Sequence, residues 1–175
     1  MNHLVIAPVL LPLLAGVLLL LLRPFAIELR RLLSLLAVIG QVVLAIVLLA
    51  RVHNGEILTY ALGGWTPPFG IVLVADRLAI WMLLITTLLA CFALLYALRG
   101  TDLKGRHFHV LFQLQLFGLN GAFLTGDLFN LFVFFEILLL ASYGLLLHGG
   151  GRLRTRAGLQ FVVSKLADSI LFLLA

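Results

Sequence analysis

Charged residues are scarce in this sequence. Asp, Glu, Lys and Arg make up 11% of its 175 positions, whereas an ordinary soluble domain has about 25%. Hydrophobic residues make up 63%, and this composition excludes a water-soluble domain. The formal net charge is +5, but the Lys and Arg residues stand between apolar runs and do not cluster on a polar surface as in nucleic-acid-binding proteins. We therefore expect no nucleic acid as a partner.

Cysteine is also scarce. Cys91 is the single cysteine and lies inside an apolar run, which excludes a disulfide framework, and a structural metal site would need more His and Cys residues close together. The sequence contains no phosphate-binding loop and no CxxC, HExxH or GxSxG motif. We therefore expect no bound metal or cofactor, and a protein that is not an enzyme.

Long apolar runs dominate what is present. They lie near residues 4–22, 32–50, 78–98, 109–125, 128–147 and 158–175, and each is roughly long enough to cross a bilayer as a helix. The runs are continuous rather than alternating, which disfavours strands. The sequence predicts an all-α, polytopic integral membrane protein with about six transmembrane helices. A cleaved signal peptide is the alternative for the first run, but that run lacks a preceding basic region and a cleavage site.

Basic residues alternate between the predicted loops, and this alternation predicts the orientation in the membrane. The first, third and fifth loops hold nine of the twelve Lys and Arg residues: Arg23, Arg30, Arg31, Arg99, Lys104, Arg106, Arg152, Arg154 and Arg156. By the positive-inside rule these loops are cytoplasmic. The N-terminus, the loop at 51–76 and the turn at 126–127 are then outside.

The last apolar run reaches Ala175 without a flanking polar or aromatic anchor. We expect from this that the sequence is a fragment of a longer protein. No internal repeat or soluble linker divides the chain, so residues 1–175 are treated as a single membrane domain.

Glu136 is the main functional candidate. It lies near the middle of a predicted span, where a charged side chain costs roughly 3 kcal/mol on insertion scales. At 100° per residue, Leu140 and Tyr143 share its side of the helix, so a polar partner must come from elsewhere. One interpretation is a structural acid bonded to a neighbouring Ser, Asn or Arg. The other is an acid on a proton or cation pathway.

Four further residues are candidates for the proton pathway. Lys165 and Asp168 stand three residues apart in the last predicted span and can pair on one helix face. They form either a structural pair, an ion-path pair or part of an altered sequence. His109 and His148 lie at the predicted cytoplasmic ends of their spans, where a histidine either caps the interface or exchanges protons.

The span before Glu136 is less apolar than the others because it contains Gln113, Gln115 and Asn120. Such amides either bond neighbouring helices together or line a hydrated path beside Glu136. Gly118 and Gly121 allow close approach of a helix.

The outer loop at 51–76, with its Gly, Pro and Trp residues, predicts a structured cap.

Two stretches together carry a resemblance to a known family. YALGGWTPPFGIVLVADRLAIWM (60–82) and NGAFLTGDLFNLFVFFEILLLASYGLL (120–146) closely resemble the D subunit of the Mrp-type multisubunit monovalent cation/proton antiporters, also called the Pha or Mnh system. This family is similar to the antiporter-like membrane subunits of respiratory NADH:quinone oxidoreductase. The resemblance spans residues 1 to about 160.

The resemblance implies a role for Glu136. It matches the essential glutamate of the family's fifth helix, which couples to a lysine on a later broken helix and moves protons against Na⁺ or K⁺. It also implies partner subunits and the cytoplasmic membrane of a bacterium. Family members are about three times longer, so the partner lysine would lie beyond Ala175, and Lys165 is not assigned that role. SKLADS, at 164–169, departs from the uncharged stretch that the family predicts.

Three functions follow as alternatives. The chain is the N-terminal part of an antiporter subunit, or a proton-channel subunit of a respiratory NADH:quinone oxidoreductase, or a truncated structural membrane protein without transport activity.

Overall fold

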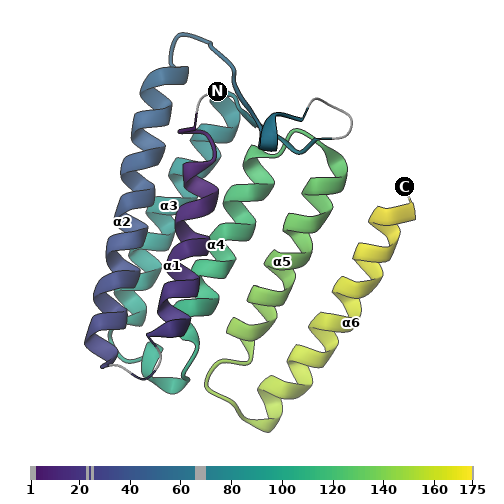
Figure 1. Ribbon diagram of the computed structural model, residues 1–175. Coiled ribbons are helices and arrows are strands. Elements are labelled where there is room, and N and C mark those ends of the chain that lie inside the picture. Colours follow the sequence, from purple (N-terminus) through teal and green to yellow (C-terminus); the bar gives the residue numbers. More distant parts are fainter. Residues whose placement is uncertain (1–2, 23, 25, 66–69, 175) are drawn as a thin grey trace.

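The computed structural model describes residues 3–22, 24, 26–65 and 70–174, without the side chains of residues 166, 168 and 172–174. Six α-helices run alternately in opposite directions through the described residues (Figure 1). They are α1 (Ala7–Leu21), α2 (Ile27–Val52), α3 (Arg77–Ala97), α4 (Phe108–Leu124), α5 (Leu128–Leu146) and α6 (Arg152–Leu174). The predicted helical membrane fold is thereby confirmed.

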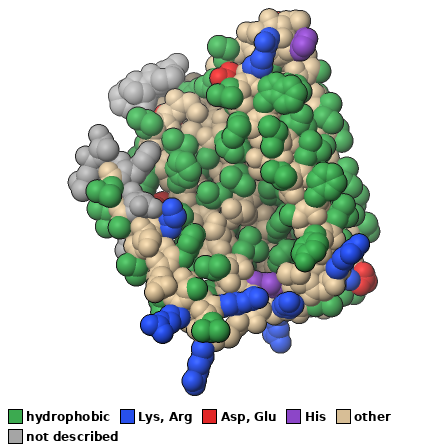
Figure 2. Space-filling model, turned by 180° about the vertical axis from the view of Figure 1, so that it is seen from behind, with side chains coloured by type: hydrophobic (Ala, Val, Ile, Leu, Met, Phe, Trp, Pro, Cys, Tyr) green, Lys and Arg blue, Asp and Glu red, His purple; other side chains and the backbone are tan. Residues whose placement is uncertain are grey.

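The apolar character of the helices agrees with a bilayer environment. α2, α3 and α5 are long and apolar enough to cross a membrane, and α1 and α4 are shorter apolar helices. Large hydrophobic side chains remain exposed, such as Phe92 on α3 and Phe129 on α5. Figure 2 shows hydrophobic side chains over most of one face and several Lys and Arg side chains at its lower end. This distribution suits a lipid-facing surface bounded by a polar headgroup region.

Two helices begin earlier than their predicted spans. α2 begins at Ile27 and α6 at Arg152, so Arg30 and Arg31, and the basic residues 152, 154 and 156, lie in helical turns rather than in loops. A helix satisfies its backbone hydrogen bonds internally and can therefore continue from lipid into the headgroup region. Apolar runs alone do not mark that extension.

The outer loop contains a short β-hairpin, which the prediction of helices for the apolar runs did not cover. β1 (Leu58–Ala61) pairs antiparallel with β2 (Val72–Ala75), and a single 3₁₀ turn, η1 (Leu62–Gly64), follows β1. The hairpin contacts the α4–α5 turn, where the Gly126 N–H donates to the Val72 carbonyl at 2.8 Å. A Cβ at Gly126 would lie 2.8 Å from Val74 Cγ2 and 3.0 Å from the Val72 carbonyl oxygen, so a larger residue there would displace the hairpin. The predicted structured cap is therefore present in the described part of the loop.

α4 lies at the centre of the bundle, and α6 lies at its edge (Figure 1). α4 packs against α1, α3 and α5, whereas α6 packs mainly against α5. Two aspartates fix helix starts: Asp76 accepts from the Ala79 N–H at the start of α3, and Asp127 accepts from the Asn130 N–H at the start of α5. These N-caps satisfy backbone donors that would otherwise have no partner at the helix ends.

Candidate functional site

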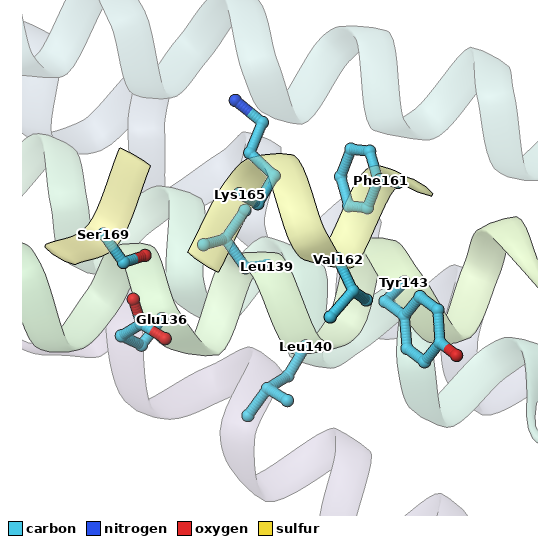
Figure 3. A pocket seen from close by; sticks show the side chains of 8 residues that line it. All are labelled: Glu136, Leu139, Leu140, Tyr143, Phe161, Val162, Lys165 and Ser169. Atoms are coloured by element: carbon cyan, nitrogen blue, oxygen red, sulfur yellow. The ribbon is translucent and has the colours of Figure 1, made fainter. Parts of the chain in front are cut away.

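A pocket between α5 and α6 contains Glu136. Its volume is about 230 Å³. α5 contributes Glu136, Leu139, Leu140 and Tyr143, and α6 contributes Phe161, Val162, Lys165 and Ser169 (Figure 3). The lining is mainly apolar. Among the described lining residues, only Glu136 and Lys165 have charged side chains.

The packing of α5 on α4 determines where Glu136 points. A Cβ at Gly121 would overlap the Phe134 ring, and one at Gly118 would lie 3.0 Å from the backbone nitrogen of Leu138. The two glycines therefore bring α4 very close to α5 on both sides of position 136. Because side chains two positions apart on a helix point in nearly opposite directions, Glu136 faces away from α4 and into the pocket.

Glu136 has few polar neighbours in this pocket. The residue is half-buried, and its Oε1 atom is shielded from solvent without a hydrogen-bond partner among the described residues. An unpartnered buried polar atom is unusual in folded proteins and calls for an explanation such as a catalytic role or an unseen water or ion. The predicted structural alternative required a neighbouring Ser, Asn or Arg bonded to Glu136, and the Oε1 atom has no such bond in the described part of the chain.

Lys165 and Ser169 line the pocket from α6. In Figure 3 the Lys165 side chain points away from the Glu136 carboxylate, while Ser169 lies on the same side of the pocket as Glu136. The side chain of Asp168 lies outside the described residues. The predicted pairing of Lys165 with Asp168 therefore stays a prediction.

His109 lies with Arg31 and Asp102 in a group of ionisable residues, here called the loop cluster. Asp102 belongs to a 3₁₀ turn, η2 (Asp102–Lys104), between α3 and α4. Its carboxylate accepts from Arg31 Nε at 2.6 Å and Nη2 at 3.0 Å, which is the bidentate geometry of a strong ion pair. His109 Nε2 lies 3.4 Å from Asp102 Oδ2. His109 is only 4% exposed, so it is a core residue rather than the interfacial cap that the sequence suggested.

Arg31 sets the charge state of Asp102. Burial by itself would raise the pKa of this carboxyl group, but the hydrogen bonds and positive charge of Arg31 outweigh burial, and His109 adds to their effect. The pKa of Asp102 therefore lies below its ordinary value. The carboxylate is charged at neutral pH and holds the start of α2 to the α3–α4 connection.

His148 lies at the same end of the bundle as the loop cluster. Its Nε2 is 2.8 Å from the Thr101 carbonyl oxygen, and its ring contacts that of Phe108, which also contacts His109. The structure thus brings the two predicted histidines together. Glu136 lies twelve positions before His148, or about 18 Å at the rise of an α-helix, so neither histidine accompanies Glu136 in its pocket.

Four buried polar side chains join α1, α2 and α4, and we call them the polar seam: Ser34, Gln41, Gln113 and Asn120. All four are fully buried. Gln113 donates to Ser34, Gln41 donates to Gln113 at 3.4 Å, and Asn120 donates to Gln41 at 3.0 Å. Asn120 also donates to the Pro8 carbonyl oxygen at 2.8 Å. The interpretation of these amides as bonds between helices is supported for Gln113 and Asn120.

Sequence reasoning missed the α2 side of the seam and most of the loop cluster. A signal was available, because Arg31, Ser34 and Gln41 stand at helical spacing in one apolar run, as do His109, Gln113 and Asn120 in another. Because the polar residues of the two runs have similar helical spacing, they could have predicted that α2 and α4 face each other. Gln115, by contrast, faces α5, where it accepts from Ser142 Oγ at 3.0 Å.

Comparisons with known proteins bear on this arrangement. No family model matches the sequence. The chain is 48% identical over 99% of its length to the probable K⁺/H⁺ antiporter D subunit of Rhizobium meliloti. It is also 41% identical to the Na⁺/H⁺ antiporter D subunit of Alkalihalophilus pseudofirmus and 39% identical to that of Bacillus subtilis. The chain is a homologue of the N-terminal third of these antiporter subunits. It spans 33–36% of the three relatives.

Solved structures agree with this homology. In the Mrp complex from a Dietzia species, one polypeptide superimposes with a TM-score of 0.89 at 29% identity, over 99% of the present chain and 34% of that polypeptide. A polypeptide of the membrane-bound sulfane sulfur reductase, an archaeal respiratory membrane complex, superimposes with a TM-score of 0.91 at 26% identity, over 97% of the present chain and 35% of that polypeptide. The same fold therefore occurs in the Mrp complex and in an archaeal respiratory membrane complex.

Proposed function

We propose that this chain forms the N-terminal part of a membrane subunit of a multisubunit Na⁺(K⁺)/H⁺ antiporter, and that Glu136 binds and releases the transported proton. The observation that carries the proposal is the Oε1 atom of Glu136, shielded inside an apolar pocket and without a partner among the described residues. The names of the three curated relatives, all antiporter subunits, support the transporter class.

The chemistry needs only a carboxyl group whose surroundings change. An apolar pocket favours the protonated acid, and a nearby cation or water favours the carboxylate. A pocket that alternates between these two conditions loads a proton from one side and releases it to the other. The partners of this chain are then protons, Na⁺ or K⁺, the lipid bilayer and the other subunits of the complex, in the cytoplasmic membrane of a bacterium.

The remaining candidates fit around Glu136 as secondary members of the same path. Lys165 lines the pocket and carries a positive charge that can stabilise the Glu136 carboxylate as its side chain moves; Asp168 lies one turn further along α6. His109 and His148 both contact the Phe108 ring at the predicted cytoplasmic end, where they are the candidates for passing the proton between Glu136 and the cytoplasm. Water must bridge the distance of about 18 Å between that end and Glu136.

The test is the Glu136→Gln substitution in the native gene product, expressed with its partner subunits in a strain that lacks cation/proton antiport. Glutamine keeps the size and polarity of the side chain but cannot carry the proton. We expect antiport in everted membrane vesicles to be abolished at normal protein level, and Glu136→Asp to retain part of it.

The matched control is Glu56→Gln, because Glu56 is an exposed carboxylate in the outer loop. We expect this variant to transport like the wild type. Unchanged antiport in Glu136→Gln would refute the proton-carrying role and favour a structural membrane protein.

A second candidate is a proton-channel subunit of a respiratory complex, favoured by the superposition on the archaeal respiratory membrane complex. Deleting the gene separates the two candidates. Loss of Na⁺ or K⁺ tolerance with intact NADH-driven quinone reduction supports the antiporter, and the opposite result supports the respiratory complex.

A further inference from the structure

Pro12 removes a hydrogen-bond donor from the middle of α1. In an α-helix each N–H donates to the carbonyl four residues earlier, and proline has no N–H. The Pro8 carbonyl oxygen, four residues before Pro12, therefore has no α-helical donor. Pro8 and Pro12 are both buried, and a buried carbonyl without a hydrogen-bond partner destabilises the folded protein.

Asn120 on α4 supplies the donor that Pro12 removes. Its Nδ2 group donates to the Pro8 carbonyl oxygen at 2.8 Å and to Gln41 Oε1 at 3.0 Å. The Pro8 carbonyl oxygen and Gln41 Oε1 are both acceptors, so the Asn120 side chain must turn its amide nitrogen toward them. Its Oδ1 atom is left without a partner among the described residues, so the orientation of the amide serves these two bonds. Proline on one helix and asparagine on another thus form a complementary pair.

This pair fixes the position of α4 along its own axis. Lipid is as apolar as leucine, so no hydrophobic force drives membrane helices together, and close packing at small residues and hydrogen bonds between helices hold them in place. α4 has hydrogen bonds on one side, from Gln113 and Asn120 to α1 and α2. On its other side Gly118 and Gly121 contact α5.

We propose that Asn120, by bonding the Pro8 carbonyl that Pro12 leaves without a donor, positions α4 and through it the segment of α5 that presents Glu136 to its pocket. The residues of α5 that contact Gly118 and Gly121 are Leu138 and Phe134, which stand two positions on either side of Glu136. A displacement of α4 is therefore transmitted at the two points that bracket the carboxylate. This role for Asn120 rests on the proposed function of Glu136, but the pairing with Pro12 does not.

A double-substitution cycle tests the pairing, in the native gene product assembled with its partner subunits. Asn120→Ala leaves the Pro8 carbonyl buried without a donor, and we expect the apparent Tm to fall by several degrees. Pro12→Ala restores an N–H to α1, so in that background Asn120→Ala should lower the Tm by less, and the remaining loss comes from the bond to Gln41. The control is Pro8→Ala, which removes a proline from the same helix without providing a donor to that carbonyl. Equal Tm losses in the wild-type and Pro12→Ala backgrounds would overturn the pairing.

Disulfide formation between α4 and α5 tests the transmission to Glu136. A Cβ at Gly118 lies 3.2 Å from the Leu138 Cβ, close to the 3.5–4.5 Å range typical of disulfides. With Cys91 replaced by Ala, we expect the Gly118→Cys/Leu138→Cys pair to oxidise several-fold more slowly when Asn120→Ala is added, and to recover when Pro12→Ala is added as well. An unchanged rate would overturn the positioning of α5.

The pH profile of antiport separates positioning from mere loss of stability. Compared at equal protein amounts, Asn120→Ala should shift the pH of half-maximal antiport, and adding Pro12→Ala should shift it back. A profile unchanged in shape would overturn the effect on Glu136. The Tm cycle and the disulfide rate do not depend on transport, so they remain informative even if Glu136→Gln refutes the proposed function.

Discussion

Buried polar side chains are bonded differently on the two sides of α4. Toward α1 and α2, each side chain of the polar seam and the loop cluster has a hydrogen bond or an ion-pair contact to another group of the protein, although single atoms such as Asn120 Oδ1 have no partner among the described residues. Toward α5 and α6, Glu136 lies in an apolar pocket with an unpartnered oxygen among the described atoms. Paired groups stabilise one arrangement of helices, whereas an unpaired acid remains able to change its charge. The comparison separates the structural half of the chain from the half that is proposed to move protons.

The comparison predicts that substitutions toward α1 and α2 reduce stability and that substitutions in the pocket reduce transport. Among the substitutions toward α1 and α2, Asp102→Asn is expected to reduce stability the most. The amide cannot offer Arg31 a charged, bidentate acceptor, and hydrogen bonds to charged groups contribute about 1.5–3 kcal/mol. We expect a loss of about 2 kcal/mol in the free energy of unfolding of the purified protein, measured by thermal denaturation in detergent.

The matched control for Asp102→Asn is Glu28→Gln. Glu28 also contacts Arg31, at 3.2 Å, but its side chain is 76% exposed, and exposed ion pairs contribute about 0–1 kcal/mol.

The dependence of stability on pH provides a second check on the ion pair of Asp102. The pKa of Asp102 is lower in the folded protein, so its stabilising effect is present above the ordinary carboxyl pKa near 4 and is lost as pH falls through the folded pKa. The difference between wild type and Asp102→Asn should narrow below about pH 4, and a constant difference would contradict the ion pair.

The next effect is expected at the glycine contact between α4 and α5. In Gly121→Ala the new Cβ would overlap the Phe134 ring, so the ring or the helix must shift, and overpacking of this kind costs about 1–3 kcal/mol. Gly16→Ala on α1 is the control, because its Cβ would meet its nearest neighbour at 3.6 Å. There we expect no loss, or a small gain from the higher helix propensity of alanine. Equal stability of the two variants, measured by the same denaturation, would show that α5 does not depend on this close contact.

The sequence was sufficient to predict the helices and Glu136 as the main candidate, because both depend on local composition. A continuous apolar run of span length predicts a membrane helix wherever it occurs, and one acid in such a run attracts notice without a tertiary model. Asp102 shows why the rest was not predicted: in a short polar loop it looks like an exposed residue, and only the packing of α2 on the α3–α4 connection buries it. The bond between Asn120 and the Pro8 carbonyl joins residues 112 positions apart, and no local pattern links them.

The β-hairpin was missed for a related physical reason. The rule that disfavours strands applies to backbone inside lipid, and residues 58–61 and 72–75 lie in the loop predicted to be outside it. There an antiparallel pair can form freely, and its pairing with the α4–α5 turn fixes the loop above the bundle. A prediction made separately for spans and loops would have allowed it.

The smallest effect is expected at the side-chain hydrogen bond between α4 and α5, from Ser142 Oγ to Gln115 Oε1 at 3.0 Å. Ser142 also donates toward the Leu138 carbonyl of its own helix at 2.7 Å, so its single proton is shared. Hydrogen bonds between membrane helices average about 0.6 kcal/mol, and Ser142→Ala should cost no more than that in the free energy of unfolding. A loss as large as that of Asp102→Asn would mean that polar bonding holds α5 to α4 as firmly as it holds α2 to the α3–α4 connection. The contrast between the two sides of α4 would then fail, because both sides would depend on polar bonding to the same extent.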